Sequence, residues 1–251
     1  QALANFEIAR EKEIHHRIKN NLQVVSSLLD LQAHKFKGRS NINDSEVIDA
    51  FRESQNRVIS MALIHEELYK RGGLEAINFS EYVEKLSDHL LSTYQLGKAN
   101  ISLKLNLEAN IFFDMDTAIP LGTIINELIA NSFKYAFPGR DKGEVRIILH
   151  RVEEDFIKVR EESECEGPKS TNLILSVSDN GVGIPKNLDI ENLDSLGLLL
   201  VTSLVEQIDG ELEINRNRGT EFVIKFTVKE KNNKASTSGS KKFNESPGFH
   251  N

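Results

Sequence analysis

The first part of the chain has apolar residues at steps of three and four, the spacing of an α-helix with one buried face. Between residues 13 and 36 these apolar positions are Ile14, Ile18, Leu22, Val25, Leu29 and Phe36. At about 100° per residue, His15 falls roughly 60° from the centre of the apolar face and His16 roughly 160° from it. Asn20 and Gln23 lie on the same side as His16. We therefore expect His15 to border a core and His16 to face solvent, where a separate domain can reach it.

A second helix is predicted after a short polar turn. Residues 3–36 form the first helix, and Asp44 or Ser45 caps the second, which runs to about Lys70. The apolar side of the second helix carries Ile48, Phe51, Val58, Ala62 and Leu68. Two long helices with a short connection form an antiparallel hairpin, which we assign to residues 1–72. Because a hairpin alone has little core, we expect it to dimerise into a four-helix bundle.

From residue 74 onward the pattern changes to strands mixed with helices. Helices are predicted at 80–94, 116–137 and 196–208, and strands at 101–107, 145–149, 173–177, 212–214 and 222–226. This mixture indicates a two-layer α/β sandwich, which we assign to residues 74–228. The predicted fold class is α+β, in which a long helical hairpin that dimerises as a four-helix bundle is followed by this sandwich.

Two polar segments lie within and after the sandwich. Residues 152–171 are rich in glutamate and are interpreted as an acidic surface insertion, for which a solvated loop without function is the simplest explanation. Residues 229–251 are rich in Ser, Asn, Lys and Gly, and we predict a disordered tail.

Composition narrows the class of protein. The net charge of −7 argues against a nucleic-acid partner. No apolar run approaches the ~20 residues of a membrane span. Cys165 is the single cysteine, so an internal disulfide is excluded and a reducing cytoplasm is the natural location. Because the chain opens on Gln1, without an initiator Met or a signal peptide, we expect a fragment of a longer protein.

One predicted helix carries a charged and polar face. Its residues Glu127, Asn131, Lys134 and Tyr135 are spaced i, i+4, i+7 and i+8, so an α-helix places them on one side. An amide oxygen is a hard ligand for Mg²⁺, and a lysine neutralises phosphate charge. The pattern fits a magnesium–phosphate site, and it fits an exposed polar helix face equally well.

A turn that contains glycines follows one of the predicted strands. Asp179 at the strand end can accept a hydrogen bond from an amine such as that of adenine, and Gly181 and Gly183 let the backbone approach a ligand closely. Farther along, Gly197 and Leu198 open a helix whose free N–H groups favour phosphate. An acid, glycines and a helix start in this order form a much more specific signal than Gly-x-Gly alone.

These stretches resemble the N-box, G1 box and G2 box of the GHKL ATPase fold, which histidine kinases share with gyrase-type topoisomerases, MutL and the Hsp90 chaperones. The stretch Glu13–Leu31 resembles the H-box of sensor histidine kinases in the subclass that reads Glu-x-x-His-Arg-x-Lys-Asn, similar to the HisKA_2 and HWE kinases. The resemblance spans roughly residues 10–228, with every box in the expected order. It implies transfer of the ATP γ-phosphoryl group to a histidine and then to an Asp of a response-regulator receiver domain.

The resemblance also implies roles for individual residues. The catalytic group would comprise the phosphoacceptor His16 together with Glu13, Lys19, Asn20 and Glu127. Mg²⁺ would be held by Asn131, with Glu127 beside the metal or its waters. The contacts to ATP would come from Asn131, Lys134, Tyr135, Asp179, Gly181, Gly183, Gly197, Leu198 and Thr220.

Three features depart from the commonest histidine kinases. Arg17 stands where those kinases carry an acidic residue that is expected to act as general base, so Glu13 and Glu127 are both candidates for that role. The segment between Pro185 and Ser195 is short and lacks the F-box phenylalanine, which implies a small lid. The acidic insertion does not belong to the family pattern.

Two other functions stay compatible with parts of the pattern. A GHKL protein that hydrolyses ATP to drive conformational change would use Glu127 to activate water, and His15 and His16 would be incidental. A degenerate kinase that serves as a dimeric scaffold would have damaged boxes, whereas the boxes here are intact. The partners expected for a kinase are a second copy of the chain, a response regulator and an upstream sensor domain.

Overall fold

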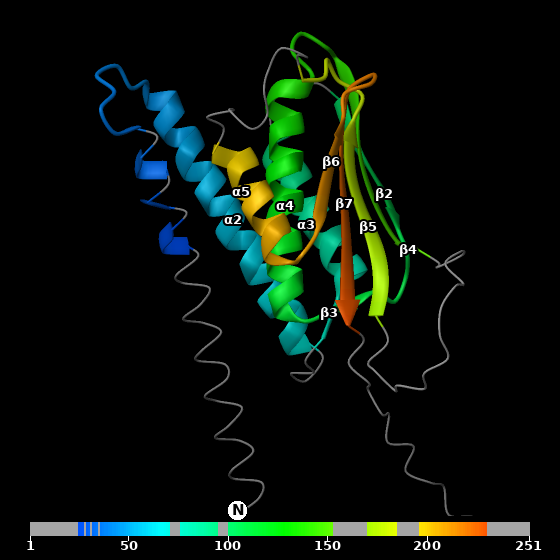
Figure 1. Cartoon of the computed structure of the whole chain (residues 1–251). Helices are drawn as coiled ribbons and strands as arrows, with labels where there is room; N and C mark the ends of the chain where they lie inside the picture. Colours follow the sequence, from blue (N-terminus) through cyan, green and yellow to red (C-terminus); the bar gives the residue numbers. More distant parts are fainter. Residues whose placement is uncertain are drawn as a thin grey trace, which may run out of the picture.

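The structure is a computed structural model that describes most of the chain (Figure 1). The described residues are 25–27, 29–30, 32–34, 36–70, 76–94, 100–152, 170–184 and 196–229. The H-box residues Glu13, His16, Lys19 and Asn20 lie outside these ranges, as do residues 153–169 of the acidic insertion and the C-terminal tail. What the sequence predicts for these segments stays a prediction.

The helices after the turn at Gly38 agree with the sequence prediction. They are α2 Asp44–Lys70, α3 Phe79–Tyr94, α4 Met115–Asn131 and α5 Leu196–Gln207. Asp114 caps α4, because its side chain accepts a hydrogen bond from the backbone N–H of Thr117. After α4 the chain continues as a π-helix, η1 Ser132–Ala136, where the sequence predicted a continuous α-helix to Phe137. No helix among the described residues is both long and apolar enough to cross a membrane.

The main strands form a five-stranded sheet in the order β2-β4-β5-β7-β6. They are β2 Asn100–Leu107, β4 Lys142–Val152, β5 Ser170–Asp179, β6 Glu211–Asn215 and β7 Thr220–Lys229. β2 and β4 run parallel, and the other neighbouring strands are antiparallel. A separate short pair, β1 Ile77–Asn78 and β3 Phe112–Phe113, was not predicted, because two-residue strands show no alternation.

The core lies between one face of this sheet and the helices α3, α4 and α5 (Figure 1). Along β4 the alternating residues Val145, Ile147 and Leu149 are fully buried. They share one hydrophobic cluster with Ile125 of α4 and Val201 of α5. This arrangement confirms the predicted α/β sandwich and the α+β class.

Helix α2 packs against α4 and α3 (Figure 1). The face that α2 buries carries Ala50, Arg57, Met61 and Ile64. The apolar face predicted from the sequence is a different one. Its residues Ile48, Phe51 and Val58 are exposed, and 68% of the surface of Phe51 is accessible. Helix α2 therefore has one face buried against the sandwich and a second face with apolar side chains that are exposed in the single chain.

Candidate functional site

Asp179, the last residue of β5, accepts three hydrogen bonds from the described residues. Its Oδ1 accepts from the backbone N–H groups of Gly181 at 2.9 Å and Thr220 at 3.3 Å, and its Oδ2 accepts from Ser132 Oγ at 3.1 Å. Thr220 is the partner of Asp179 in the register of β5 and β7. A carboxylate offers about four acceptor positions, so one is left for an amine donor. We name Asp179 and its three donors, Ser132, Gly181 and Thr220, the Asp179 cluster.

The turn after Asp179 lies directly on the end of η1. A Cβ on Gly181 would come within 2.2 Å of the carbonyl oxygen of Ala136, and Val182 donates its backbone N–H to that same oxygen at 2.8 Å. Gly183 has a φ of 77°, which residues with side chains rarely adopt. Close packing therefore requires glycine at position 181, and backbone conformation favours it at position 183.

The π-helix changes where the N-box side chains point. A continuous α-helix would place the four predicted N-box residues on one side, and the wider turn of η1 changes the direction of the residues that follow Asn131. Ser132 faces Asp179, and Lys134 reaches α2. Tyr135 is 68% exposed. Glu127 also pairs with α2, so Glu127 and Lys134 keep the common side that the sequence predicted, whereas Tyr135 is turned toward solvent.

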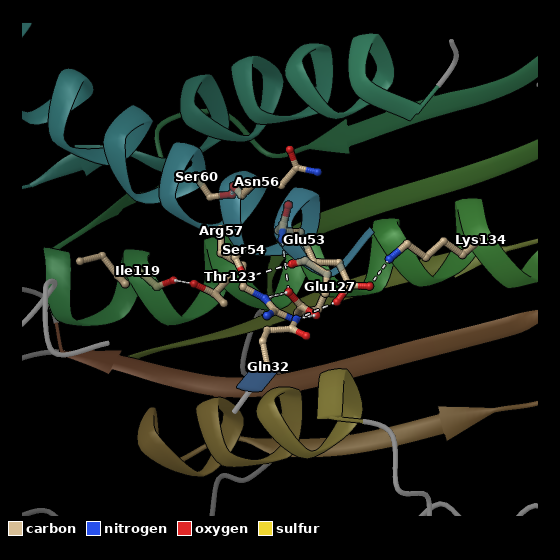
Figure 2. A network of polar contacts seen from close by, with 12 residues as sticks. Gln32, Glu53, Ser54, Asn56, Arg57, Ser60, Ile119, Thr123, Glu127 and Lys134 are labelled. Carbon is tan, nitrogen blue, oxygen red and sulfur yellow. Dashed lines mark hydrogen bonds and ion pairs between the residues drawn. The ribbon is translucent and has the colours of Figure 1, made fainter. Parts of the chain in front are cut away.

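Glu127 of α4 forms a buried ion pair with Arg57 of α2 (Figure 2). Arg57 donates from Nε to Glu127 Oε1 at 2.5 Å and from Nη2 to Glu127 Oε2 at 2.7 Å. The side chain of Arg57 is 1% exposed and that of Glu127 is 6% exposed. Burial acts to lower the pKa of Arg57, but its hydrogen bonds and charge attraction with Glu127 outweigh burial, and the pKa is raised. Arg57 thus stays a cation that engages both carboxylate oxygens.

Lys134 of η1 forms an ion pair with Glu53, one turn before Arg57 on α2 (Figure 2). Glu53 Oε2 accepts a hydrogen bond from Gln32 Nε2 at 2.9 Å and lies 4.0 Å from Nη2 of Arg57. Burial acts to lower the pKa of Lys134, but pairing with Glu53 more than compensates, and the pKa is raised. Glu53, Arg57, Glu127 and Lys134 are named the charge network. It joins α2 to the N-box region through two ion pairs.

Three polar atoms around the charge network are buried without a partner among the described residues. They are Gln32 Oε1, Arg57 Nη1 and Asn126 Oδ1. The amide of Asn126 donates to Glu127 Oε1 at 3.3 Å, but its oxygen stays unpaired. Each buried polar group without a partner costs about 1–3 kcal/mol. The network is therefore strongly charged but not fully satisfied.

The start of α5 lies beside Glu127 and Asn131. A Cβ on Gly197 would be 3.1 Å from Glu127 Oε2 and 3.6 Å from Asn131 Nδ2. The missing side chain keeps the first turn of α5 next to a carboxylate and a carboxamide, while Leu198 packs against the core. Helix N-termini bind anions, and carboxylate and amide oxygens bind Mg²⁺. This donor set fits a magnesium–phosphate group.

A stacked aromatic pair supports η1. The ring of Phe133 stacks on Tyr94, the last residue of α3, with centroids 5.5 Å apart and ring planes 9° from parallel. Asn56 of α2 donates from Nδ2 to the hydroxyl of Tyr94 at 3.1 Å. Helix α2 therefore also contacts the N-box region indirectly, through α3.

The sequence did not predict three residues of the Asp179 cluster and the charge network, namely Ser132, Glu53 and Arg57. That Ser132 faces Asp179 depends on the π-helix, which no local pattern announces. Glu53 and Arg57 have the i, i+4 spacing of an ordinary solvated ion pair. The one available signal of a second buried face was the row Arg57, Met61 and Ile64, at steps of four and three.

The fold and the site define a GHKL-type ATPase domain that is joined to a helical segment, the organisation of histidine kinases. Residues 13–94 match the family model for histidine kinase. Residues 116–230 match the model for histidine kinase-, DNA gyrase B-, and HSP90-like ATPase. Together the matches account for most of the chain, which belongs to the histidine kinase family, with a HisKA_2-type segment at residues 13–94.

Individual relatives agree with this assignment. The chain is 32% identical to the sensor histidine kinase PdtaS of Mycobacterium tuberculosis over 222 residues, which make up 86% of this chain and 39% of that protein. Blue-light-activated histidine kinase 2 of Erythrobacter litoralis is 24% identical over 221 residues, 86% of this chain and 56% of the relative. The chain thus spans only part of these relatives.

The fold is also similar to a solved structure, the histidine kinase domain of the Erythrobacter litoralis EL346 blue-light activated histidine kinase. The TM-score is 0.58 at 20% sequence identity, and the match covers 82% of this chain and 95% of that one. At this identity the likeness supports the fold alone.

Proposed function

We propose that this chain is the catalytic core of a sensor histidine kinase, which transfers the γ-phosphoryl group of ATP to His16. The observation that carries the proposal is the meeting of Glu127, Asn131 and Gly197 from two separate boxes. Asn131 is followed directly by Ser132 of the Asp179 cluster, so the two sets of residues adjoin. One offers an acceptor for the adenine amine and the other fits a magnesium–phosphate group, so one ATP molecule can bridge them.

The residues divide the work of binding ATP between them. Asp179 accepts a hydrogen bond from the adenine amine, while Ser132 and Thr220 fix its carboxylate. Lys134 and the N–H groups at the start of α5 offset the charge of the phosphates. Asn131 and Glu127 would hold Mg²⁺, which shields phosphate charge when it is bound.

The transfer itself needs a nucleophile and a base. The imidazole of His16 forms a bond to the γ-phosphorus, the bond to the bridging oxygen breaks, ADP leaves and a base takes the imidazole proton. Glu13 and Glu127 are the two candidates for this base. While Arg57 engages both oxygens of Glu127, Glu127 cannot accept a proton without losing that contact, so Glu127 can act as the base only after Arg57 has moved away.

Labelling with γ-labelled ATP tests the proposal. His16→Gln should lose all acid-labile label from the protein and still bind nucleotide, and the matched variant His15→Gln should keep measurable label. On the predicted helix His15 borders the apolar face, where a phosphoryl group of about −2 charge would be poorly solvated. Loss of label in His15→Gln alone would contradict the assignment of His16. Release of phosphate with no label on the protein would favour the hydrolytic GHKL function instead.

The proposed kinase is a homodimer that forms through the hairpin. The exposed apolar row Ile48, Phe51 and Val58 supports this, because large apolar side chains that gather on one exposed helix face favour a protein interface. In the full chain, Phe51→Glu should convert the dimer to a monomer in light scattering. Arg52→Glu changes the charge of an exposed neighbour and should leave the dimer intact. If the unaltered chain is already a folded monomer, this part of the proposal is wrong.

The phosphoryl group would next pass to an Asp of a response-regulator receiver domain, under control of a sensor domain in the full-length protein. The relatives named sensor histidine kinase support this step. Because the reaction uses ATP and the sequence has one cysteine, we place it in the cytoplasm. Loss of label from His16 when a receiver domain is added, with label appearing on that domain, is the expected result.

A further inference from the structure

The charge network brings side chains of α2 to two N-box groups of the proposed ATP site. The carboxylate of Glu53 pairs with Lys134, and the guanidinium of Arg57 pairs with Glu127 (Figure 2). Lys134 is the group proposed to offset phosphate charge, and Glu127 is the group proposed to lie beside Mg²⁺. Helix α2 therefore supplies an anion where a phosphate would bind and a cation where the metal would bind.

We propose that Glu53 and Arg57 of α2 compete with Mg²⁺–ATP for Lys134 and Glu127, so that docking of this part of α2 and binding of nucleotide oppose each other. The inference rests on the proposed function, because it takes Lys134 and Glu127 as the groups that face the phosphates and the metal. It adds a regulatory contact that couples the helical segment to the nucleotide site.

The geometry makes the two ion pairs respond together. Glu53 and Arg57 lie one turn apart on one helix, and their side chains approach to 4.0 Å. A shift of this turn that frees Lys134 therefore also draws Arg57 away from Glu127. The carboxylate of Glu53 would repel an incoming phosphate if it stayed in place, because like charges at this range disfavour each other.

The same region of the α2 contact is incompletely satisfied. Gln32 Oε1, Arg57 Nη1 and Asn126 Oδ1 are buried without partners among the described residues. Toward its other end α2 is held by Ile64 in the hydrophobic core and by an ion pair between Glu67 and Lys85 of α3. We therefore expect nucleotide to release the turns that carry Glu53 and Arg57 and to leave the turn at Ile64 packed.

The first test measures binding of AMP-PNP with Mg²⁺ to the full chain by calorimetry. Glu53→Gln removes the competing carboxylate and should tighten binding by about fivefold or more, the usual size of a coupling between two sites. Glu46→Gln is the matched control. It removes the same charge from the same helix, at an exposed residue that pairs with Arg39 at 3.2 Å. Its affinity should equal that of the unaltered chain.

The second test follows hydrogen exchange of the unaltered chain with and without Mg²⁺–AMP-PNP. Exchange should rise for amides around residues 50–57 and stay unchanged around Ile64. Greater protection of residues 50–57 in the nucleotide complex, or equal affinity of Glu53→Gln and the unaltered chain, would overturn the inference while leaving the proposed function in place. If the unaltered chain binds no nucleotide, the proposed function and this inference both fail.

Discussion

The Asp179 cluster and the charge network both draw on the region where α4 passes into η1, yet they are built in different ways. Ser132 belongs to the cluster, and Glu127 and Lys134 belong to the network. The Asp179 cluster takes its hydrogen bonds from β5, β7, η1 and the turn after β5, all within the sandwich. The charge network depends on α2, which belongs to the predicted hairpin. The sandwich thus orders one end of the proposed ATP site by itself, whereas a helix from another segment occupies the other end.

The two regions also differ in how their charges are stabilised. Asp179 is partly exposed and accepts from backbone N–H groups and a hydroxyl, so its carboxylate is satisfied without a buried cation. Glu127 and Arg57 are both buried, and each depends on the other to offset its desolvation. A buried pair of this kind is sensitive to the loss of one partner, which suits a contact that must change during a reaction cycle.

The largest effect is expected on the free energy of unfolding, when the buried ion pair of the charge network is broken. Arg57→Met leaves Glu127 buried without its cation, and loss of one partner of a buried pair costs about 3–5 kcal/mol. We expect a fall of this size in the free energy of unfolding, measured by denaturant titration without nucleotide. Arg52→Met removes an exposed arginine of the same helix and should change the value by less than about 0.5 kcal/mol.

A double variant sharpens this test. Arg57→Met combined with Glu127→Met removes both charges, and replacing a buried pair by apolar side chains of similar volume is often nearly neutral. Most of the lost stability should therefore return. If Arg57→Met alone costs less than about 1 kcal/mol, Glu127 reaches water in solution and α2 is not docked as the structure has it.

A smaller effect is expected from the Asp179 cluster. In Asp179→Asn the amide nitrogen turns a donor toward groups that are themselves donors, namely Ser132, Gly181 or the adenine amine. Loss of a charged acceptor is worth roughly 1.5–3 kcal/mol, so ATP affinity should fall about 10- to 100-fold in a nucleotide titration. Ser132→Ala removes one neutral donor and should weaken binding by about fivefold. Unchanged affinity in Asp179→Asn would remove Asp179 from the nucleotide site.

The contrast between the two regions also explains what the sequence could predict. Asp179 and Gly181 belong to one contiguous motif at a strand end, so their proximity follows from local pattern. The strands and most helices are amphipathic in the expected periods, and the sandwich could be assigned from them. That Arg57 pairs with Glu127, 70 positions later in the chain, depends on how α2 packs, and no local spacing encodes it.

Helix α2 shows most clearly what the sequence could not predict, namely which of its faces is buried. Ile48, Phe51 and Val58 belong to the apolar side that the sequence predicted for this helix, but they are exposed in the single chain. The buried face carries a charged residue, Arg57, whose burial becomes favourable only when Glu127 is opposite. The π-helix at Ser132–Ala136 escaped prediction for a related reason, since its wider turn goes with contacts from the Gly181 turn rather than with its own composition.

The smallest effect is expected far from both regions, at the acidic insertion. The sheet holds the two ends of residues 153–169, because Val152 of β4 pairs with Asn172 of β5. The insertion therefore connects adjacent antiparallel strands, a link that a short turn can make equally well. It joins β5 at Ser170, and Asp179 is at the opposite end of the strand, about 30 Å away.

Replacing residues 153–169 with a short Asn-Gly linker should therefore change the rate of autophosphorylation and the affinity for ATP by less than about twofold, since long surface insertions are thermodynamically cheap. The rate of label incorporation and a nucleotide titration check this, with circular dichroism as the control for folding. If the shortened chain folds and binds ATP normally but phosphorylates His16 slowly, the insertion acts on the helical segment and not on the nucleotide site. If ATP affinity falls instead, residues 153–169 reach the Asp179 cluster from the far end of the sheet. In that case this end of the ATP site would also depend on a segment outside the sandwich core, as the charge network does.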